Sequence, residues 1–223
     1  MVDFDALTRA SLRRWQEASL TRKTLSDNVA KSLVAAKKRY EAVGARTGVP
    51  WAVIAVIHQR ESSQNWGRSL AQGDPWDRVS THIPAGRGPF GSWEEAAADA
   101  LVNCHPYLAK RKDWSLAGVL IALEMYNGLG YASKGVPSPY LWAGTDQYKS
   151  GKYVRDGVYD PSDVDQQLGC VAMLFSMMAL DPSITFTGAK IIPIQPAPSV
   201  TNPAKGSLGA SIASILNAIF KRK

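Results

Sequence analysis

The spacing of hydrophobic residues predicts a chain built mainly of helices. Residues 3–19 and 24–46 are two predicted helices, and in the second one apolar residues recur at helical spacing with lysines and arginines between them. Residues 51–61 are apolar almost all round, which places this helix in the centre of a fold rather than on its surface. Further helices are expected at 92–108, at 114–129 and from residue 162 or 163 to 180.

Two long stretches between these helices lack any periodic pattern. Residues 62–91 are rich in Gly, Pro, Ser and Asp, with a short hairpin expected around residues 79–83, and residues 130–161 carry several tyrosines and a tryptophan. Long irregular segments in a compact domain usually have a function. The expected fold class is therefore mainly α, in an α+β arrangement with a small hairpin or irregular loop lobe.

The C-terminal part of the chain has a different composition. Prolines among small residues, four of them between positions 193 and 203, make 182–206 a predicted linker after a first domain at 1–181. Residues 207–223 have an amphipathic pattern that ends in Lys-Arg-Lys. Such a helix suits an anionic membrane surface, and it equally suits docking on the preceding domain. Both alternatives stay open.

Composition and charge narrow the classes of partner. The 223 residues are 45% hydrophobic, which supplies one sizeable core, and the net charge of +7 indicates an anionic partner. Lysines and arginines are scattered over the predicted helices rather than gathered in an aromatic-interleaved patch, so no nucleic acid is expected. Cys104 and Cys170 have no metal-ligand spacing and are expected to be buried, reduced thiols. We expect a monomer without a cofactor.

Glu61 is the leading candidate for chemistry. A carboxylate at the end of a hydrophobic helix is desolvated, which raises its pKa and keeps it protonated near neutral pH. A protonated carboxyl can donate a proton to the leaving oxygen of a glycosidic bond. The alternative is a glutamate that merely reaches solvent or pairs with Arg60 or Arg68.

Glu61 belongs to a set of sequence motifs that occur in order along the chain. The run Val56-Ile-His-Gln-Arg-Glu61-Ser62 resembles the catalytic segment of goose-type lysozymes and soluble lytic transglycosylases, where an apolar helix ends in Glu-Ser at the substrate cleft. Tyr126-Asn127 is similar to their Tyr-Asn segment, which faces the bound sugar. A group of phage and prophage lysozymes is similar at four further segments, which are 73–76, 81–87, 140–142 and 151–154. The resemblance spans about residues 45–180.

The resemblance implies a lysozyme-like domain that degrades peptidoglycan, of the endolysin type. The N-terminus has no basic start followed by an apolar run, and no segment is long enough to span a membrane. Synthesis in the cytoplasm without a signal peptide, followed by release to the cell wall, is the expectation. The Gly-Leu-Met-Gln segment of typical transglycosylases is absent. Hydrolase and lytic transglycosylase therefore both stay open, as does a non-catalytic wall-glycan-binding module.

A hydrolase also needs a second catalytic group. Asp74 lies in the loop where lysozymes often place a second carboxylate, although Gly-Asp-Pro is also a common turn. Thr81 lies where phage lysozymes use a threonine to hold water, and Glu124 could reach the site through folding or be a buried structural carboxylate. Asp77 is expected to pair with Arg78 or Arg87.

The remaining candidates are expected to contact substrate. His58 shares a helix face with Glu61, and because His-x-x-Glu is not the His-Glu-x-x-His arrangement of zinc enzymes, no metal is expected. The aromatic members could stack on sugars or simply anchor their loop. The predicted substrate-binding residues are Ser62, His58, Arg87, Tyr126, Asn127, Tyr140 and Trp142.

Overall fold

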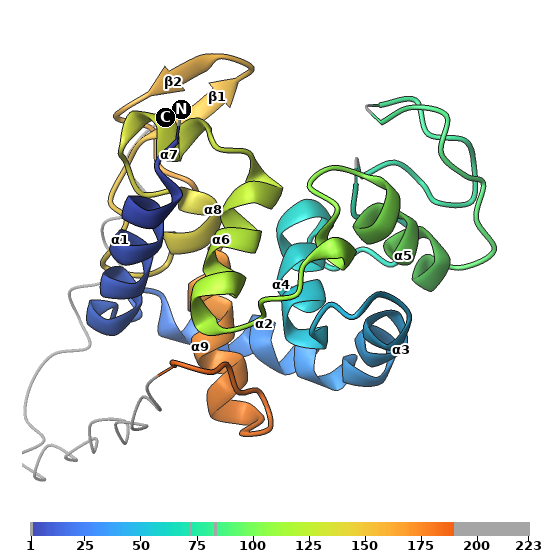
Figure 1. Cartoon of the computed structure of the whole chain (residues 1–223), viewed down its shortest axis with the longest axis horizontal. Helices are drawn as coiled ribbons and strands as arrows, with labels where there is room; N and C mark the ends of the chain where they lie inside the picture. Colours follow the sequence, from blue (N-terminus) through green and yellow to red (C-terminus); the bar gives the residue numbers. More distant parts are fainter. Residues whose placement is uncertain (1, 72, 83, 190–223) are drawn as a thin grey trace, which may run out of the picture. The chain divides into compact units, whose positions relative to one another are not determined.

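The computed structural model describes residues 2–71, 73–82 and 84–189, and this part of the chain is mainly helical (Figure 1). The predicted helix over 24–46 is broken at Ala36, where φ of −90° and ψ of 6° interrupt the helical backbone. The elements in the order of the chain are α1 (Phe4–Glu17), α2 (Lys23–Ala35), α3 (Lys37–Thr47), α4 (Trp51–Ser62), α5 (Trp93–Asn103), the 3₁₀ turn η1 (Leu108–Lys110), α6 (Leu116–Asn127), α7 (Gly130–Lys134), α8 (Pro139–Trp142), β1 (Lys152–Arg155), β2 (Val158–Asp160) and α9 (Cys170–Leu180).

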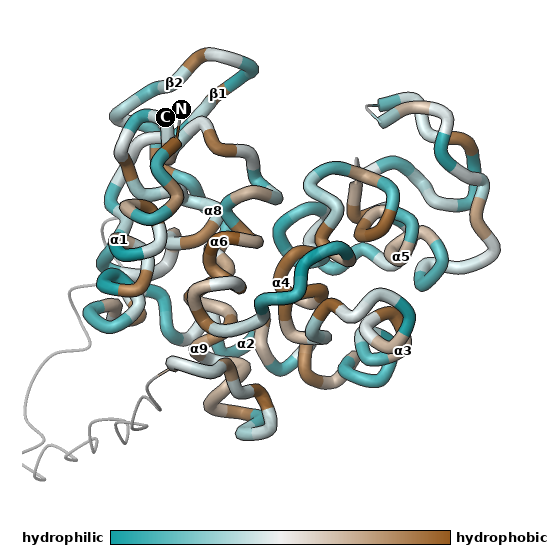
Figure 2. The backbone as a smooth tube through the Cα atoms, in the orientation of Figure 1, coloured by the Kyte–Doolittle hydropathy of each residue, from teal (hydrophilic) through white to brown (hydrophobic). Residues whose placement is uncertain are grey.

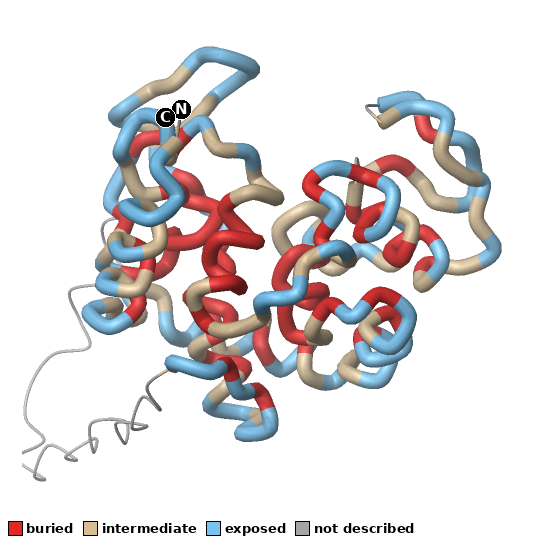
Figure 3. Tube along the Cα trace, in the orientation of Figure 1, coloured by how far each residue is buried: buried red, intermediate tan, exposed pale blue. Residues whose placement is uncertain are grey.

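Helix α4 is the centre of the core, as its sequence predicts. Every residue from Ala52 to His58 is buried (Figure 3). The helix packs against α2, α3, α6 and α9, so its apolar surface meets another helix on each side. A helix that is apolar all round can be stable only in such a position. Its last turn, which carries Glu61, emerges from this packing.

The neighbouring helices complete the core around α4. Apolar residues dominate α6, whereas α1 is largely hydrophilic and packs one side against α6 (Figure 2). Helix α9 packs along α2 and also contacts α8. The close approach of α8 and α9 requires Gly169, because an added Cβ there would collide with the backbone of Leu141.

The β-hairpin lies in a different place from the one that the sequence predicts. The described residues 79–82 form no strand; Val79 is exposed, and backbone bonds between Ser80 and Arg87 hold this segment as a loop. Strands β1 and β2 instead form an antiparallel hairpin in the stretch that was expected to be irregular. Arg155 is opposite Val158, and the Asp156-Gly157 turn joins them, with φ of 71° at Gly157.

The C-terminal boundaries also differ from the prediction. Helix α9 begins at Cys170 rather than at residue 162 or 163, and the segment before it runs as a loop across the molecule. Beyond α9, Ile184 and Phe186 are buried in the core, and the backbone N–H of Leu116 donates to the carbonyl of Thr187. The first domain therefore extends past the predicted limit of 181.

The predictions about the two cysteines and about membrane spans concern residues that the structure describes. Cys104 and Cys170 are buried and not joined in a disulfide, as expected. Among the described residues, no helix combines the length and apolar character that a membrane span requires. The rest of the predicted linker (190–206) and the predicted amphipathic helix (207–223) lie outside the described residues.

Candidate active site

Glu61 lies in the last turn of α4, and its carboxyl group has an unusual environment. Its Oε1 accepts a hydrogen bond of 2.8 Å from the hydroxyl of Tyr140. It forms no ion pair within the described part of the chain: Arg60 pairs with Asp165, and Arg68 donates to the carbonyl of Gly73. Burial raises the pKa of Glu61, and the Tyr140 bond and the charge of Arg60 oppose that rise. The alternative of a salt-bridged Glu61 is therefore wrong.

A network of buried polar groups fixes Tyr140 behind the carboxyl. The Arg60 guanidinium lies 4.9 Å from the centre of the Tyr140 ring, in cation–π contact. Arg60 also bonds to Asp165 at 2.8 Å, and both side chains are only 7% exposed. Asp165 in turn accepts from the backbone N–H of Gln167. Asp165 and Arg60 were not among the predicted site residues, because nothing in the local sequence relates residue 165 to residue 60.

His58 stabilises the end of α4 from inside the core. Its Nε2 lies 3.1 Å from the carbonyl oxygen of Asn65, and its Nδ1 lies 3.0 Å from the Tyr40 hydroxyl. Because a carbonyl can only accept, Nε2 carries the proton and Nδ1 accepts from Tyr40. Burial lowers the pKa of His58 to about 4, in agreement with a neutral ring. The ring is fully buried, so the predicted contact of His58 with substrate is not what the structure shows.

The hydrogen bond between His58 and the Asn65 carbonyl helps to explain the sharp turn that follows Glu61. Ser63 and Gln64 have φ of 55° and 59°, which residues with a Cβ rarely adopt. The Gln64 side chain donates to Tyr40, and His58 holds the next carbonyl, so two anchors from the core stabilise the strained turn.

Asp74 and Thr81 lie close together, but Asp74 already has its hydrogen-bond partners. Its Oδ2 accepts from the backbone N–H groups of Thr81 and His82 at 2.7 and 3.0 Å, and its Oδ1 lies 2.6 Å from His82 Nδ1. These bonds lower the pKa of Asp74 to about 2. The Thr81 hydroxyl lies 3.5 Å from the same carboxylate, and Thr81 is exposed. Asp74 therefore holds the loop, as expected for turn chemistry.

The loop that carries Asp74 lies against the end of α4. A Cβ built at Gly73 would lie 4.0 Å from the Glu61 carbonyl. Tyr126 fixes the same loop, because its hydroxyl donates to the carbonyl of Leu70 at 2.9 Å. Burial raises the pKa of Tyr126, and the charge of nearby Glu61 adds to that rise. Tyr126 is thus near Glu61, with its hydroxyl engaged by the protein.

Glu124 lies elsewhere in the core. It is buried on α6, and the charge that acts on it is that of Arg14 on α1. Desolvation raises its pKa to about 7. No hydrogen bond or ion pair joins it to Glu61 within the described residues, so the structure does not bring these two carboxyl groups into contact.

Several other predicted residues are engaged by the protein itself. The Ser62 hydroxyl donates to the carbonyl of His58 in its own helix, and Arg87 forms a two-point ion pair with Asp99. Trp142 is 1% exposed in the core, so its predicted sugar contact is wrong in this structure. Asp77 pairs with Arg78 at 3.5 Å on the surface, as expected.

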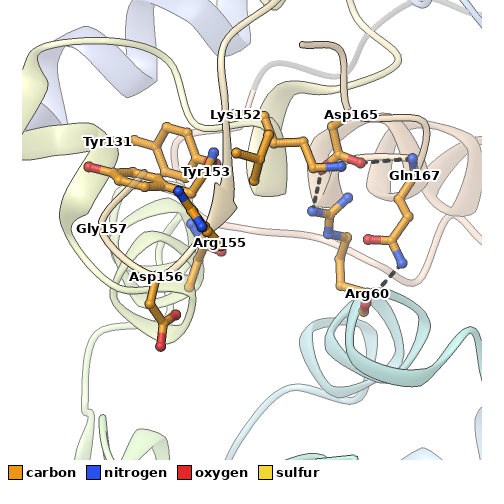
Figure 4. A pocket seen from close by; sticks show the side chains of 11 residues that line it. Arg60, Tyr131, Lys152, Tyr153, Arg155, Asp156, Gly157, Asp165 and Gln167 are labelled. Atoms are coloured by element: carbon orange, nitrogen blue, oxygen red, sulfur yellow. Dashed lines mark hydrogen bonds and ion pairs between the residues drawn. The ribbon is translucent and has the colours of Figure 1, made fainter. Parts of the chain in front are cut away.

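A cavity of about 470 Å³ opens beside Arg60. Asn127 lines it, and its amide donates to the Ser138 hydroxyl at 3.2 Å. The opposite wall is the β1–β2 hairpin, with Lys152, Tyr153 and Arg155 (Figure 4). Of the predicted site residues, Asn127 alone lines this cavity. The Asp156-Gly157 pair, a typical hairpin turn sequence, was the signal that could have identified this wall.

The arrangement combines a half-buried carboxyl whose pKa is raised with a polar cavity that Arg60, the preceding residue, lines. Comparison of the chain with protein-family models, with curated proteins and with solved structures gives no match.

Proposed function

We propose that the protein cleaves the glycan backbone of bacterial peptidoglycan, with a lysozyme-like fold and with Glu61 as the general acid. The observation that carries this proposal is the Glu61 carboxyl, which is desolvated at the end of a buried helix and is hydrogen-bonded by Tyr140. A raised pKa favours the form of this group that carries a proton. That proton can pass to the glycosidic oxygen as the bond between this oxygen and the anomeric carbon breaks.

The setting of Glu61 supports an acid better than a structural carboxylate. A structural carboxylate in such a position is normally ionised and paired, because an unpaired buried charge is costly. Here the adjacent Arg60 is directed to Asp165 instead. The neutral form of the carboxyl is thereby favoured, and Arg60, the residue before it, lines the cavity together with Asn127.

A lytic transglycosylase is the second candidate, and the state of Asp74 favours it. A hydrolase needs a base or a polar group to position the attacking water. Asp74 accepts hydrogen bonds at both oxygens from Thr81 and His82, which leaves it poorly placed for this role. In a transglycosylase the hydroxyl of the substrate itself attacks the anomeric carbon and gives its proton to the carboxylate that Glu61 has become, so one carboxyl group can serve first as acid and then as base.

Zymography on gels that contain peptidoglycan tests the proposal. The wild-type chain should clear the gel and Glu61→Gln should not, because the amide cannot donate an acidic proton. Glu17→Gln, which changes an exposed glutamate of α1, is the matched control and should clear normally. Clearing by Glu61→Gln would refute the acid role, and binding without clearing by the wild type would identify a non-catalytic wall-binding module.

Mass spectrometry of the released fragments separates the two chemistries. Reducing ends indicate hydrolysis, and anhydro-muramyl ends indicate transglycosylation. If Thr81→Val abolishes the formation of reducing ends, its exposed hydroxyl positions the water; unchanged products exclude that role.

A further inference from the structure

The cavity beside Arg60 contains an unbalanced group of charges. Its floor is the buried Arg60–Asp165 ion pair, and β1 contributes Lys152 to its wall. Figure 4 shows the Lys152 side chain directed toward this pair. Lys152 forms no ion pair within the described part of the chain, and the carboxylate of Asp165 is already paired with Arg60.

Arg60 is paired with Asp165, which leaves Lys152 without an ion-pair partner among the described residues that line the cavity. Asp165 already accepts from Arg60 and from the Gln167 backbone, and the Arg60 Nε is buried without a hydrogen-bond partner. Arg155 adds a further positive charge on the hairpin, and Asp156 adds one negative charge at the turn. The lining residues therefore carry three positive and two negative charges, and a bound anion would balance them.

We propose that this cavity is a subsite for a carboxylate carried by the substrate, with Lys152 as its main cation and Arg155 in support. The naming of the substrate rests on the proposed function. Alternate sugars of peptidoglycan carry a lactyl group, whose acid is either free or continued by a stem peptide that contains an acidic residue. Chitin-like polymers lack such a group. The subsite would thus select peptidoglycan over uncharged glycans built on the same sugar backbone.

Rigidity of the floor favours a specific subsite over a general attraction. Arg60 is held by the Leu168 carbonyl, by Asp165 and by the Tyr140 ring, so it cannot swing out to pair with a ligand. Lys152 is half-buried on a hairpin strand and has a long, free ammonium group. The ligand would therefore meet a rigid floor, formed by Arg60 and Asp165, and one adaptable hydrogen-bond donor, the ammonium group of Lys152.

Titration of the ¹⁵N-labelled full chain with small sugars tests the subsite. N-acetylmuramic acid provides a free lactyl carboxylate, N-acetylmuramyl-L-alanyl-D-isoglutamine provides a peptide carboxylate, and N-acetylglucosamine provides none. The acids should bind more tightly than N-acetylglucosamine and should shift the amide signals of β1. The acid that binds more tightly identifies the source of the carboxylate, either the lactyl group or the stem peptide.

Substitution of Lys152 separates the subsite from the overall charge of the protein. Lys152→Gln should weaken binding of the preferred acid about tenfold, as expected when one charge-assisted hydrogen bond is lost, and should leave N-acetylglucosamine binding unchanged. Lys149→Gln removes the same charge from an exposed lysine outside the cavity and should have little effect. Equal effects of the two variants, or equal affinities for acid and neutral sugar, would overturn the proposal.

Failure of this inference and failure of the proposed function give different results. Clearing of peptidoglycan by the wild type together with no preference for the acids refutes the subsite and leaves the glycosidase. Preference for the acids that depends on Lys152, without any clearing, refutes the glycosidase and retains the carboxylate subsite.

Discussion

Glu124→Gln distinguishes a structural carboxyl from a catalytic one. Glu124 is 3% exposed, and desolvation raises its pKa from the ordinary 4.5 to about 7. A carboxyl with a raised pKa in the folded state stabilises that state below its ordinary pKa, and the stabilisation is lost as the pH rises through the folded value. The free energy of unfolding should fall by about 1.4 kcal/mol for each pH unit in this window, or about 3 kcal/mol in all.

Urea unfolding between pH 4 and pH 8 measures this effect. The difference between Glu124→Gln and the wild type should grow in favour of the variant as the pH rises. Glu17→Gln is the control, since Glu17 is exposed and also acts on the charge of Arg14; its difference from the wild type should stay nearly constant. A pH-independent difference for Glu124→Gln would refute the buried neutral carboxyl. Loss of glycan cleavage by a stable Glu124→Gln variant would show that it is catalytic after all.

Three further predictions concern the groups around Glu61. Tyr140→Phe should move the alkaline limb of the activity profile upward by about half to one pH unit, because the lost bond favours the charged form of Glu61 by about 1 kcal/mol; an unmoved limb would exclude this coupling. Asp165→Asn should cost about 3–5 kcal/mol of stability, measured by urea unfolding, because it leaves the Arg60 charge buried and unpaired. Asp74→Asn should speed hydrogen exchange at residues 80–82 and leave α4 protected; unchanged exchange would show that Asp74 does not hold this loop.

Sequence patterns predicted the helices well where burial alone determines them. Residues 51–61 are apolar on every side, so both the helix and its central position follow from one segment. The start of α9 could not be predicted in this way, because residues 163–169 are kept out of the helix by distant partners: Asp165 by Arg60, and Gly169 by the backbone of α8. The misplaced hairpin had another cause. The Asp156-Gly157 turn was in the sequence, but the aromatic residues around it fit a sugar-binding or loop-anchoring stretch as well as they fit two strands.

The candidate site was harder to predict from the sequence than the helices, because more of it depends on distant residues. The desolvation of Glu61 could be predicted, because this residue lies at the end of an apolar helix. The roles of Tyr140 and Trp142 could not, since an aromatic residue in an irregular stretch has the same pattern whether it faces sugar or the core. In the structure Trp142 is buried, and Tyr140 faces the carboxyl from the protein side. Tyr140 and Glu61 lie 79 positions apart in the sequence, so their contact depends on the three-dimensional fold rather than on local sequence.

The pairing of Arg60 with Asp165 affects the electrostatic environment of Glu61. The C-terminal end of a helix carries partial negative charge, which opposes a second negative charge in the last turn and acts in the same direction as burial. A neighbouring arginine would normally cancel both effects by pairing with the glutamate. Because Asp165 and the Tyr140 ring hold the Arg60 guanidinium, its charge lowers the pKa of Glu61 less than the Tyr140 bond does. A carboxylate 104 positions away along the chain thereby keeps Arg60 from cancelling the rise in the pKa of Glu61.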